Sequence, residues 1–206
     1  MEDEIYQRLT AGVAKPKKNK LAIFICGASG TGKTSMRHKF LRDLKIKTTF
    51  VYLNLDDIKE VGLEEARKLL QAITSRVIED GYSIFLDGTC RNKQETVDRI
   101  KTLKSKGYKV MVGMVYASLP VVLKRLDERR GQYVSESVAK DIYQHMKKNA
   151  ETYINIKQID ELYLYTNETS PNLIVSFDNN KKQVTCVAGA EEGLEEFYFD
   201  VSKYCN

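Results

Sequence analysis

The residues best suited to chemistry lie near the start of the chain, where glycines are interspersed with small and hydroxyl-bearing residues. Residues 27–34 read Gly-Ala-Ser-Gly-Thr-Gly-Lys-Thr and match the pattern GxxxxGK[ST]. In this pattern the glycines let the backbone fold around phosphate groups with its N–H groups pointing inward, and the helix that follows adds partial positive charge at its N-terminus. An apolar run over residues 21–26 precedes the pattern, and a helical stretch begins at Lys33. This succession of strand, loop and helix predicts a site for a nucleoside triphosphate.

Each position of this loop has an expected contact. Lys33 is expected to bridge the β- and γ-phosphates, and the Thr34 hydroxyl to bind Mg²⁺. The residues expected to surround the nucleotide are Gly27, Ala28, Ser29, Gly30, Thr31, Gly32, Lys33, Thr34 and Ser35.

Carboxylates follow two of the other expected strands. Asp56 and Asp57 come just after the β-prone residues 49–53, and Asp87 directly follows residues 82–86. Because ligands of an open parallel sheet gather outside the carboxyl ends of its strands, these acids are placed to face the phosphate loop. There a carboxylate can accept the proton of an acceptor hydroxyl, and Asp87 can organise Mg²⁺, usually through water. A second interpretation, that Asp56 or Asp57 caps the next helix, stays open.

Three arginines form a further group. Arg125, Arg129 and Arg130 precede Gly131 at the end of an expected helix over residues 119–130. Arg125 and Arg129 are four residues apart and would share one helical face. A movable helix of this kind can neutralise charge on a phosphoryl group in transfer and exclude water, so we expect an arginine-bearing lid. The alternative is a solvated face that pairs with neighbouring acids.

Strand and helix patterns alternate along the chain, which is typical of an α/β fold with a mostly parallel sheet. We expect the three-layer sandwich of a P-loop NTPase, with a hairpin in the tail. The expected strands cover residues 21–26, 49–53, 82–86, 108–116, 161–165, 172–177 and 183–187, and the expected helices 33–44, 63–80, 93–106, 119–130 and 135–153. Residues 1–14 could add a helix, and residues 196–204 fit neither pattern clearly.

Length and composition bound the architecture and the surroundings of the protein. With 206 residues we expect a single kinase-sized domain, with a core over about residues 20–178, a basic N-terminal extension over 1–20 and a β-rich tail over 179–206. No apolar run approaches the roughly 18 residues that a membrane span needs. The net charge of +5 permits an anionic substrate without requiring one. The four cysteines form no CxxC pair, so we expect reduced structural thiols and a cytoplasmic protein.

Taken together and in order, these motifs resemble the zeta-toxin family of small P-loop kinases, and they are similar to the related phage-type polynucleotide kinases. The resemblance covers about residues 20–178. It rests on the phosphate loop, Asn54-x-Asp56, Asp87-Gly88-Thr89-x-Arg91, Lys106-Gly107-Tyr108-Lys109-Val110, and the arginines before Gly131-Gln132-Tyr133-Val134. Zeta toxins use ATP to phosphorylate a hydroxyl of UDP-N-acetylglucosamine, and polynucleotide kinases phosphorylate the 5′-hydroxyl of nucleic-acid ends.

The resemblance implies roles for particular residues. Asp56 becomes the general base, with ATP and Mg²⁺ held at Lys33 and Thr34. Lys59, Thr89 and Arg91 become acceptor contacts, and Arg125, Arg129 and Arg130 the lid. Asp87 stands where zeta toxins often carry Glu, and the tail after Asp178 matches no part of the family pattern. An antitoxin partner is compatible with the family and is not encoded in any motif of this chain.

Three functions therefore remain in view. The leading hypothesis is an ATP-dependent kinase acting on a small nucleotide-linked acceptor similar to UDP-N-acetylglucosamine. The second is a kinase of a nucleic-acid 5′-hydroxyl or of a hydroxyl on a modified base, favoured by the basic run over residues 15–20 and by the 12 tyrosines that could stack on bases. The third is a nucleotide-binding switch that hydrolyses its ligand slowly and transfers nothing.

Overall fold

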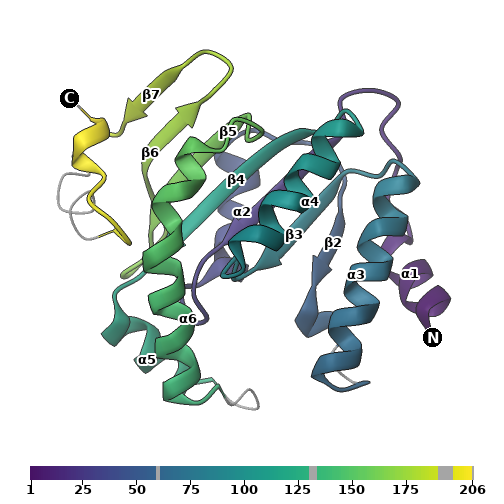
Figure 1. The fold of residues 1–206 in the computed structure, drawn as a ribbon, viewed down its shortest axis with the longest axis horizontal. Coiled ribbons are helices and arrows are strands. Elements are labelled where there is room, and N and C mark those ends of the chain that lie inside the picture. Colours follow the sequence, from purple (N-terminus) through teal and green to yellow (C-terminus); the bar gives the residue numbers. More distant parts are fainter. Residues whose placement is uncertain (59–60, 130–133, 190–196, 206) are drawn as a thin grey trace.

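A seven-stranded sheet forms the centre of the computed structural model, which describes residues 1–58, 61–129, 134–189 and 197–205. The strand order is β2-β3-β1-β4-β5-β6-β7. The first five strands are parallel, and β6 and β7 are antiparallel additions at one edge (Figure 1). The strands are β1 Leu21–Cys26, β2 Val51–Asn54, β3 Ile84–Gly88, β4 Lys109–Tyr116, β5 Glu161–Thr166, β6 Asn172–Asp178 and β7 Gln183–Cys186.

Helices cover both faces of the sheet and complete three layers. The α-helices are α1 Glu2–Thr10, α2 Lys33–Asp43, α3 Leu63–Glu79, α4 Lys93–Ser105, α5 Leu119–Asp127 and α6 Glu136–Asn149, and short 3₁₀ segments include η1 Leu55–Asp57, η3 Ala150–Asn155 and η4 Ser202–Tyr204. In Figure 1, α2 lies behind the sheet, whereas α3, α4 and α6 lie in front of it. The expected mostly parallel P-loop sandwich is confirmed, as is the hairpin of β6 and β7.

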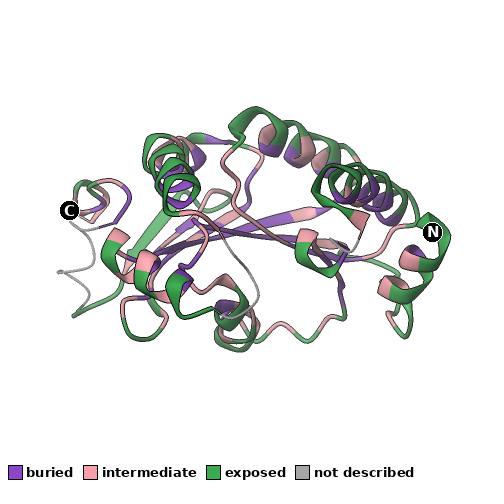
Figure 2. Cartoon of the chain, turned by 90° about the horizontal axis from the view of Figure 1, so that it is seen from below, coloured by how far each residue is buried: buried purple, intermediate pink, exposed green. Residues whose placement is uncertain are grey.

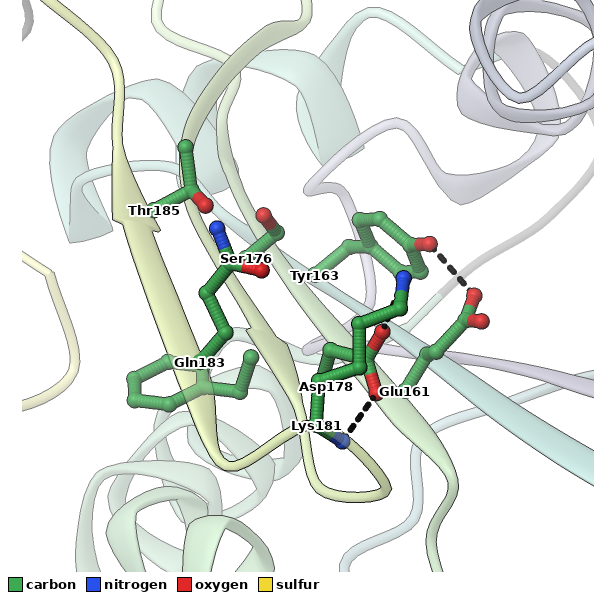
Figure 3. Close-up of a pocket in the computed structure, with 8 residues that line it drawn as sticks. Glu161, Tyr163, Ser176, Asp178, Lys181, Gln183 and Thr185 are labelled. Atoms are coloured by element: carbon green, nitrogen blue, oxygen red, sulfur yellow. Dashed lines mark hydrogen bonds and ion pairs between the residues drawn. The ribbon is translucent and has the colours of Figure 1, made fainter.

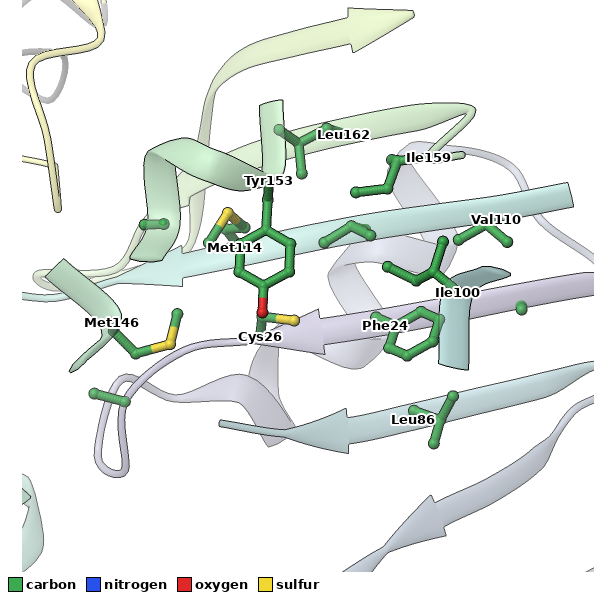
Figure 4. Packing of buried hydrophobic residues seen from close by; sticks show 14 of the residues in the cluster. Phe24, Cys26, Leu86, Ile100, Val110, Met114, Met146, Tyr153, Ile159 and Leu162 are labelled. Carbon is green, nitrogen blue, oxygen red and sulfur yellow. The ribbon is translucent and has the colours of Figure 1, made fainter. Parts of the chain in front are cut away.

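Two apolar clusters hold these layers together. Met36 and Phe40 of α2 pack on one face of the sheet, against strand residues that include Ile23 and Ile25. The larger cluster fills the other face beneath α3, α4 and α6 (Figure 4). Buried residues concentrate in the central strands, with helices above and below them (Figure 2). Strands β1 and β4 are buried along nearly their whole length, because a parallel sheet covered on both faces needs continuous apolar runs.

The N-terminal segment is packed onto the domain. Tyr6 of α1 is buried, donates a hydrogen bond to Asp80 and carries the Arg76 guanidinium over its ring at 3.9 Å. In the basic run, Lys15 and Lys20 lie over tyrosine rings of the domain. Lys20 directly precedes β1, whereas the phosphate loop follows the other end of that strand. The division into core, extension and tail stays a prediction.

The expectation of reduced cysteines is wrong. Cys26 is bonded to Cys90 and Cys186 to Cys205. The first pair forms because β1 and β3 are neighbours whose ends are in register, which brings the Cα atoms of Cys26 and Cys90 to 5.3 Å. Disulfides are typical of oxidising compartments, so the cysteines no longer support a cytoplasmic location. The cytoplasmic location itself stays a prediction. Among the described helices, none has the length and apolar character for crossing a membrane.

Candidate active site

The phosphate loop links the carboxyl end of β1 to the first turn of α2. Gly30 and Gly32 have φ of 86° and 87°, in the left-handed region that favours glycine. A Cβ on Gly32 would lie 2.2 Å from Nδ2 of Asn167, and one on Gly27 would lie 2.6 Å from the carbonyl oxygen of Val115. Gly30 and Gly32 are therefore required by backbone conformation and close packing, and Gly27 by close packing alone.

Lys33 lies inside this loop. Its Nζ donates to the carbonyl oxygens of Gly27 at 3.0 Å and Ala28 at 3.1 Å. Burial lowers the pKa of Lys33, and the nearby charges of Asp87 and Asp56 oppose that shift. The backbone N–H groups of the first helical turn have no intrahelical acceptor, and they make this end of α2 suited to anions.

Two distant residues hold the loop from outside. Asn167, just after β5, donates from Nδ2 to the carbonyl oxygen of Thr31 at 2.7 Å, and its backbone N–H donates to the carbonyl oxygen of Tyr116 at 2.7 Å. Tyr198, in the C-terminal segment, accepts a hydrogen bond from the N–H of Ala28 at 3.0 Å. The loop shape is thus set by contacts far away in sequence.

The predicted carboxylates lie at the same edge of the sheet. Asp87 is in register with Ile25 of β1 and Asn54 of β2. Burial raises the pKa of Asp87, an effect that the positive charges of Lys33 and Arg37 oppose and the charge of Asp56 reinforces. Asp56 lies two residues after Asn54, in the turn that follows β2, and Lys33 begins the helix that follows β1 and its loop. The structure therefore brings Asp56, Asp87 and Lys33 together.

Asp56 lies in η1, directly after β2. Asn54 supports this turn, because its Oδ1 accepts the N–H of Asp56 at 3.0 Å. The capping interpretation is wrong: α3 begins after Gly62, which has no side chain to cap it, so neither Asp56 nor Asp57 serves that purpose.

The predicted arginines do not share one helical face, because the helix ends before Arg129. Helix α5 ends at Asp127, and the N–H of Arg129 instead closes a tighter turn on the carbonyl oxygen of Leu126. Arg129 is exposed, and its positive charge adds to the effect of burial in lowering the pKa of Lys33. Arg130 falls outside the described residues. The lid stays a prediction.

Arg125 is the arginine most closely tied to the loop. Its Nη2 donates to the carbonyl oxygen of Glu168 at 2.9 Å. Its Nη1 is buried, has no hydrogen-bond partner among the residues that the structure describes, and lies 3.9 Å from the position of a Cβ on Gly32. A buried guanidinium donor without a partner beside a glycine-lined loop fits a polyphosphate ligand.

Two of the three predicted acceptor residues, Thr89 and Arg91, lie on the segment after β3. Thr89 is partly buried, and Arg91 forms an outer ion pair with Asp141 of α6 at 3.8 Å. The disulfide to Cys26 holds this segment beside the phosphate loop, and the hydroxyl of Tyr153 donates to the carbonyl oxygen of Cys90 at 2.8 Å. Lys59 lies outside the described residues.

Sequence reasoning missed Arg37, Asn167 and Tyr198. Arg37 is one helical turn after Lys33, and its guanidinium lies over the ring of Tyr52 at 4.3 Å. Its positive charge opposes the effect of burial, which raises the pKa of Asp87. Its spacing from Lys33 and the place of Asn167 after an expected strand were usable signals. Tyr198 carries no such signal.

A pocket of about 220 Å³ on β5, β6 and β7 lies away from this site (Figure 3). Its polar groups bond to one another: the Tyr163 hydroxyl donates to Glu161, and Lys181 forms an ion pair with Asp178. Glu161 begins β5, whereas the phosphate loop and Asn167 lie at the carboxyl ends of parallel strands. This pocket therefore takes no part in the nucleotide site.

Solved structures share the fold. A structure from the PezAT chromosomal toxin–antitoxin system of Streptococcus pneumoniae matches with a TM-score of 0.68 at 18% sequence identity, over 97% of this chain and 85% of the other. The AvrRxo1-ORF1:AvrRxo1-ORF2 structure with sulphate ions matches with a TM-score of 0.73 at 14% identity, over 97% and 72% of the two chains. The Pnkp1/Rnl/Hen1 RNA repair complex matches with a TM-score of 0.53 at 18% identity, over 66% and 47%.

The sequence itself carries the family assignment. No curated protein matches the chain. The family model described as zeta toxin matches residues 4–182, which include the phosphate loop, both carboxylate segments and α5. The chain belongs to the zeta toxin family and is a P-loop kinase.

Proposed function

We propose that this kinase transfers the γ-phosphate of ATP to a hydroxyl of a nucleotide-linked acceptor similar to UDP-N-acetylglucosamine. The observation that carries the proposal is that Asp56, Asp87 and Lys33 follow or end the neighbouring strands β2, β3 and β1 at the same end of the sheet, where Asp87 is in register with Ile25 and Asn54. A carboxylate beside a phosphate loop is placed to take a proton from an acceptor hydroxyl, which is the one proton transfer that this reaction needs.

The donor half of the site is suited to ATP. Lys33 and the N–H groups of the loop would hold the phosphates, and the buried Nη1 of Arg125 would donate to them. A structure of AvrRxo1-ORF1:-ORF2 with ATP shares the fold, with a TM-score of 0.69 at 14% identity, over 97% of this chain and 71% of the other, which supports ATP as the nucleotide. Positive charge from Arg125 and Arg129 would stabilise the phosphoryl group as it moves.

Thr34 and Asp87 would hold Mg²⁺. The hydroxyl and the carboxylate are oxygen ligands of the kind that this ion prefers. Both residues lie beside Lys33, and Mg²⁺ bound there would neutralise charge on the phosphates.

The acceptor half would be formed by Asp56 as general base, with Thr89, Arg91 and Lys59 as contacts. Within the part of the chain that the structure describes, the Arg91 guanidinium forms an exposed ion pair with Asp141 at 3.8 Å, which an anionic acceptor could replace. The disulfide at Cys90 keeps Thr89 and Arg91 at a fixed place beside the phosphate loop.

An acceptor assay with purified protein tests the proposal. The protein is incubated with Mg²⁺ and ATP labelled on the γ-phosphate, together with UDP-N-acetylglucosamine, a 5′-hydroxyl oligonucleotide, or no acceptor. Label should enter the UDP-sugar, and Asp56→Asn should lower that rate by about a hundredfold or more while ATP affinity changes little. Asp57→Asn is the matched control and should keep most of the rate.

The other outcomes separate the alternatives. Label in the oligonucleotide alone would contradict the UDP-sugar and favour a polynucleotide kinase. Hydrolysis of ATP that needs no acceptor and is unchanged in Asp56→Asn would contradict phosphoryl transfer by this base.

A protein partner is also proposed. The PezAT structure comes from a toxin–antitoxin system, which supports a partner of the antitoxin kind for this chain. Purification of the chain from its native cells, with identification of stoichiometric companions, would test this.

A further inference from the structure

The C-terminal segment, residues 197–205, folds back onto the phosphate loop. Phe197, Tyr198 and Val201 are buried, with 4%, 1% and 0% of their surface exposed. The Tyr198 hydroxyl accepts from the N–H of Ala28 at 3.0 Å and donates to the carbonyl oxygen of Val115 at 3.1 Å. One side chain from the end of the chain therefore contacts the second residue of the phosphate loop.

The contact lies where β1 leaves the sheet. Cys26, the last residue of β1, is in register with Met114 of β4, and the chain then turns away at Gly27 to form the loop. Gly27 lies so close to the Val115 carbonyl that no Cβ fits between them. The Tyr198 hydroxyl bonds both the loop, at Ala28, and strand β4, at Val115. It therefore fixes the point at which the loop leaves the sheet.

The ring of Tyr198 is held firmly enough to do this. It packs against Tyr116, Tyr143 and Phe197 with ring centroids 5.2, 5.7 and 5.3 Å away. Further along the segment, the Cys186–Cys205 disulfide joins it to β7. Tyr204 donates to Glu151 at 3.1 Å and adds a second attachment.

We propose that Tyr198 is a positioning residue for nucleotide binding, which acts through the N–H of Ala28 to set the start of the phosphate loop. A phenylalanine would fill the same aromatic cluster, so packing alone does not call for the hydroxyl. Burying a hydroxyl is costly unless it is hydrogen-bonded, and both of its bonds go to the loop and the adjacent strand.

Tyr198 and Asn167 hold the two ends of the phosphate loop. Asn167 holds the carbonyl of Thr31 near the far end of the loop, whereas Tyr198 holds the N–H of Ala28 at its start. The stretch between these two anchors contains the glycine of positive φ, Gly30. With both ends fixed, the loop is organised before the nucleotide arrives, which lowers the ordering cost of binding.

Tyr198→Phe tests the inference, which rests on the proposed binding of ATP at this loop. Removal of the hydroxyl leaves the Ala28 N–H buried without its acceptor, so the dissociation constant of ATP with Mg²⁺, measured by calorimetry, should rise about tenfold. Hydrogen exchange should also be faster at the Ala28 amide in the ligand-free protein. Wild-type protein that binds no ATP would instead contradict the proposed function.

Two controls separate positioning from general stability. Tyr204→Phe removes a hydroxyl of the same segment that, among the described residues, donates a hydrogen bond to Glu151 and none to the phosphate loop, so this variant should bind ATP as wild type does. Phe197→Leu loosens the same aromatic cluster and should lower the melting temperature with little change in ATP affinity. Wild-type ATP affinity in Tyr198→Phe, or an equal loss of affinity in Phe197→Leu, would overturn the inference.

Discussion

Gly32 illustrates how closely single atoms constrain the phosphate loop. It adopts a positive φ and leaves room for Nδ2 of Asn167, which in turn holds the carbonyl of Thr31. Gly32→Ala should weaken ATP binding by more than tenfold, because the new methyl group must displace Asn167 as well as strain the backbone by about 1 kcal/mol. Binding is measured by calorimetry, and unfolding by urea.

Gly12→Ala is the matched control. Gly12 has a φ of 70° but open space around its Cβ position, so this change carries the backbone strain without the crowding. It should lower the free energy of unfolding by about 1 kcal/mol and leave ATP binding intact. Equal ATP affinity in the two variants would mean that Asn167 moves aside freely.

The residues of the site differ in how far sequence alone could predict them. The phosphate loop could be predicted because the residues expected to contact phosphate form one contiguous stretch with a fixed pattern. Asp56 and Asp87 could be placed near it because each follows a strand of a parallel sheet. Tyr198 could not, because its role depends on a contact with Ala28 across 170 residues and on no local pattern.

At the scale of elements, one disulfide joins the end of β1 to the segment after β3, and the other joins β7 to the C-terminal segment. Cys26 and Cys90 are 64 residues apart, and Cys186 and Cys205 are 19 apart. Each bond restricts the unfolded chain, more so for the longer loop. Replacing Cys26 and Cys90 together by Ala should lower the free energy of unfolding by about 4 kcal/mol, and replacing Cys186 and Cys205 by about 3 kcal/mol.

Urea unfolding of the two double variants in non-reducing buffer checks this order. The native wild-type protein should also show no thiol that reacts with a chromogenic disulfide reagent. Reactive thiols in protein purified under oxidising conditions would contradict the pairing, and a larger loss from the shorter loop would contradict the loop-length explanation.

The presence and type of the strands and helices could be predicted from the sequence better than the residues at which they end. The strands and the principal helices were expected from apolar periodicity, and the parallel order from the alternation of the two. Helix α5 was expected to continue to residue 130 but ends at Asp127. The cysteines were misassigned because their pairing depends on which strands are neighbours, and the spacing of cysteines along the chain does not encode that order.

At the scale of the molecule, tyrosine hydroxyls connect distant segments. The chain has 12 tyrosines and no tryptophan. Tyr6 joins α1 to Asp80, Tyr153 joins η3 to the segment after β3, and Tyr198 joins the C-terminal segment to the phosphate loop. Both ends of the chain, which lie at opposite ends of the sheet in Figure 1, are attached in this way.

These buried hydroxyls make stability sensitive to alkaline pH. Burial raises the pKa of Tyr6 to about 12, with a further contribution from Asp80, and burial raises the pKa of Tyr108 to about 12 as well. The ordinary value, 10.0, applies to the unfolded chain. The folded state therefore holds these protons more tightly, so their contribution is complete below about pH 10 and is lost as the pH rises toward about 12.

Tyr108→Phe tests this directly. The Tyr108 hydroxyl donates to the carbonyl oxygen of Tyr82 at 2.7 Å, so at neutral pH the variant should be less stable than wild type by about 1 kcal/mol. Above about pH 10 the unfolded wild-type chain is stabilised, because it releases the Tyr108 proton while the folded chain still holds it. The variant has no such proton, so its unfolded chain is not stabilised in this way. The gap in unfolding free energy between variant and wild type should therefore close above about pH 10 and reverse as the pH approaches about 12, because a shift of two pKa units corresponds to about 2.7 kcal/mol; urea unfolding with phenolate absorbance as the monitor measures this. A gap that stays constant across that range would show that the Tyr108 phenol titrates alike in the folded and unfolded chains.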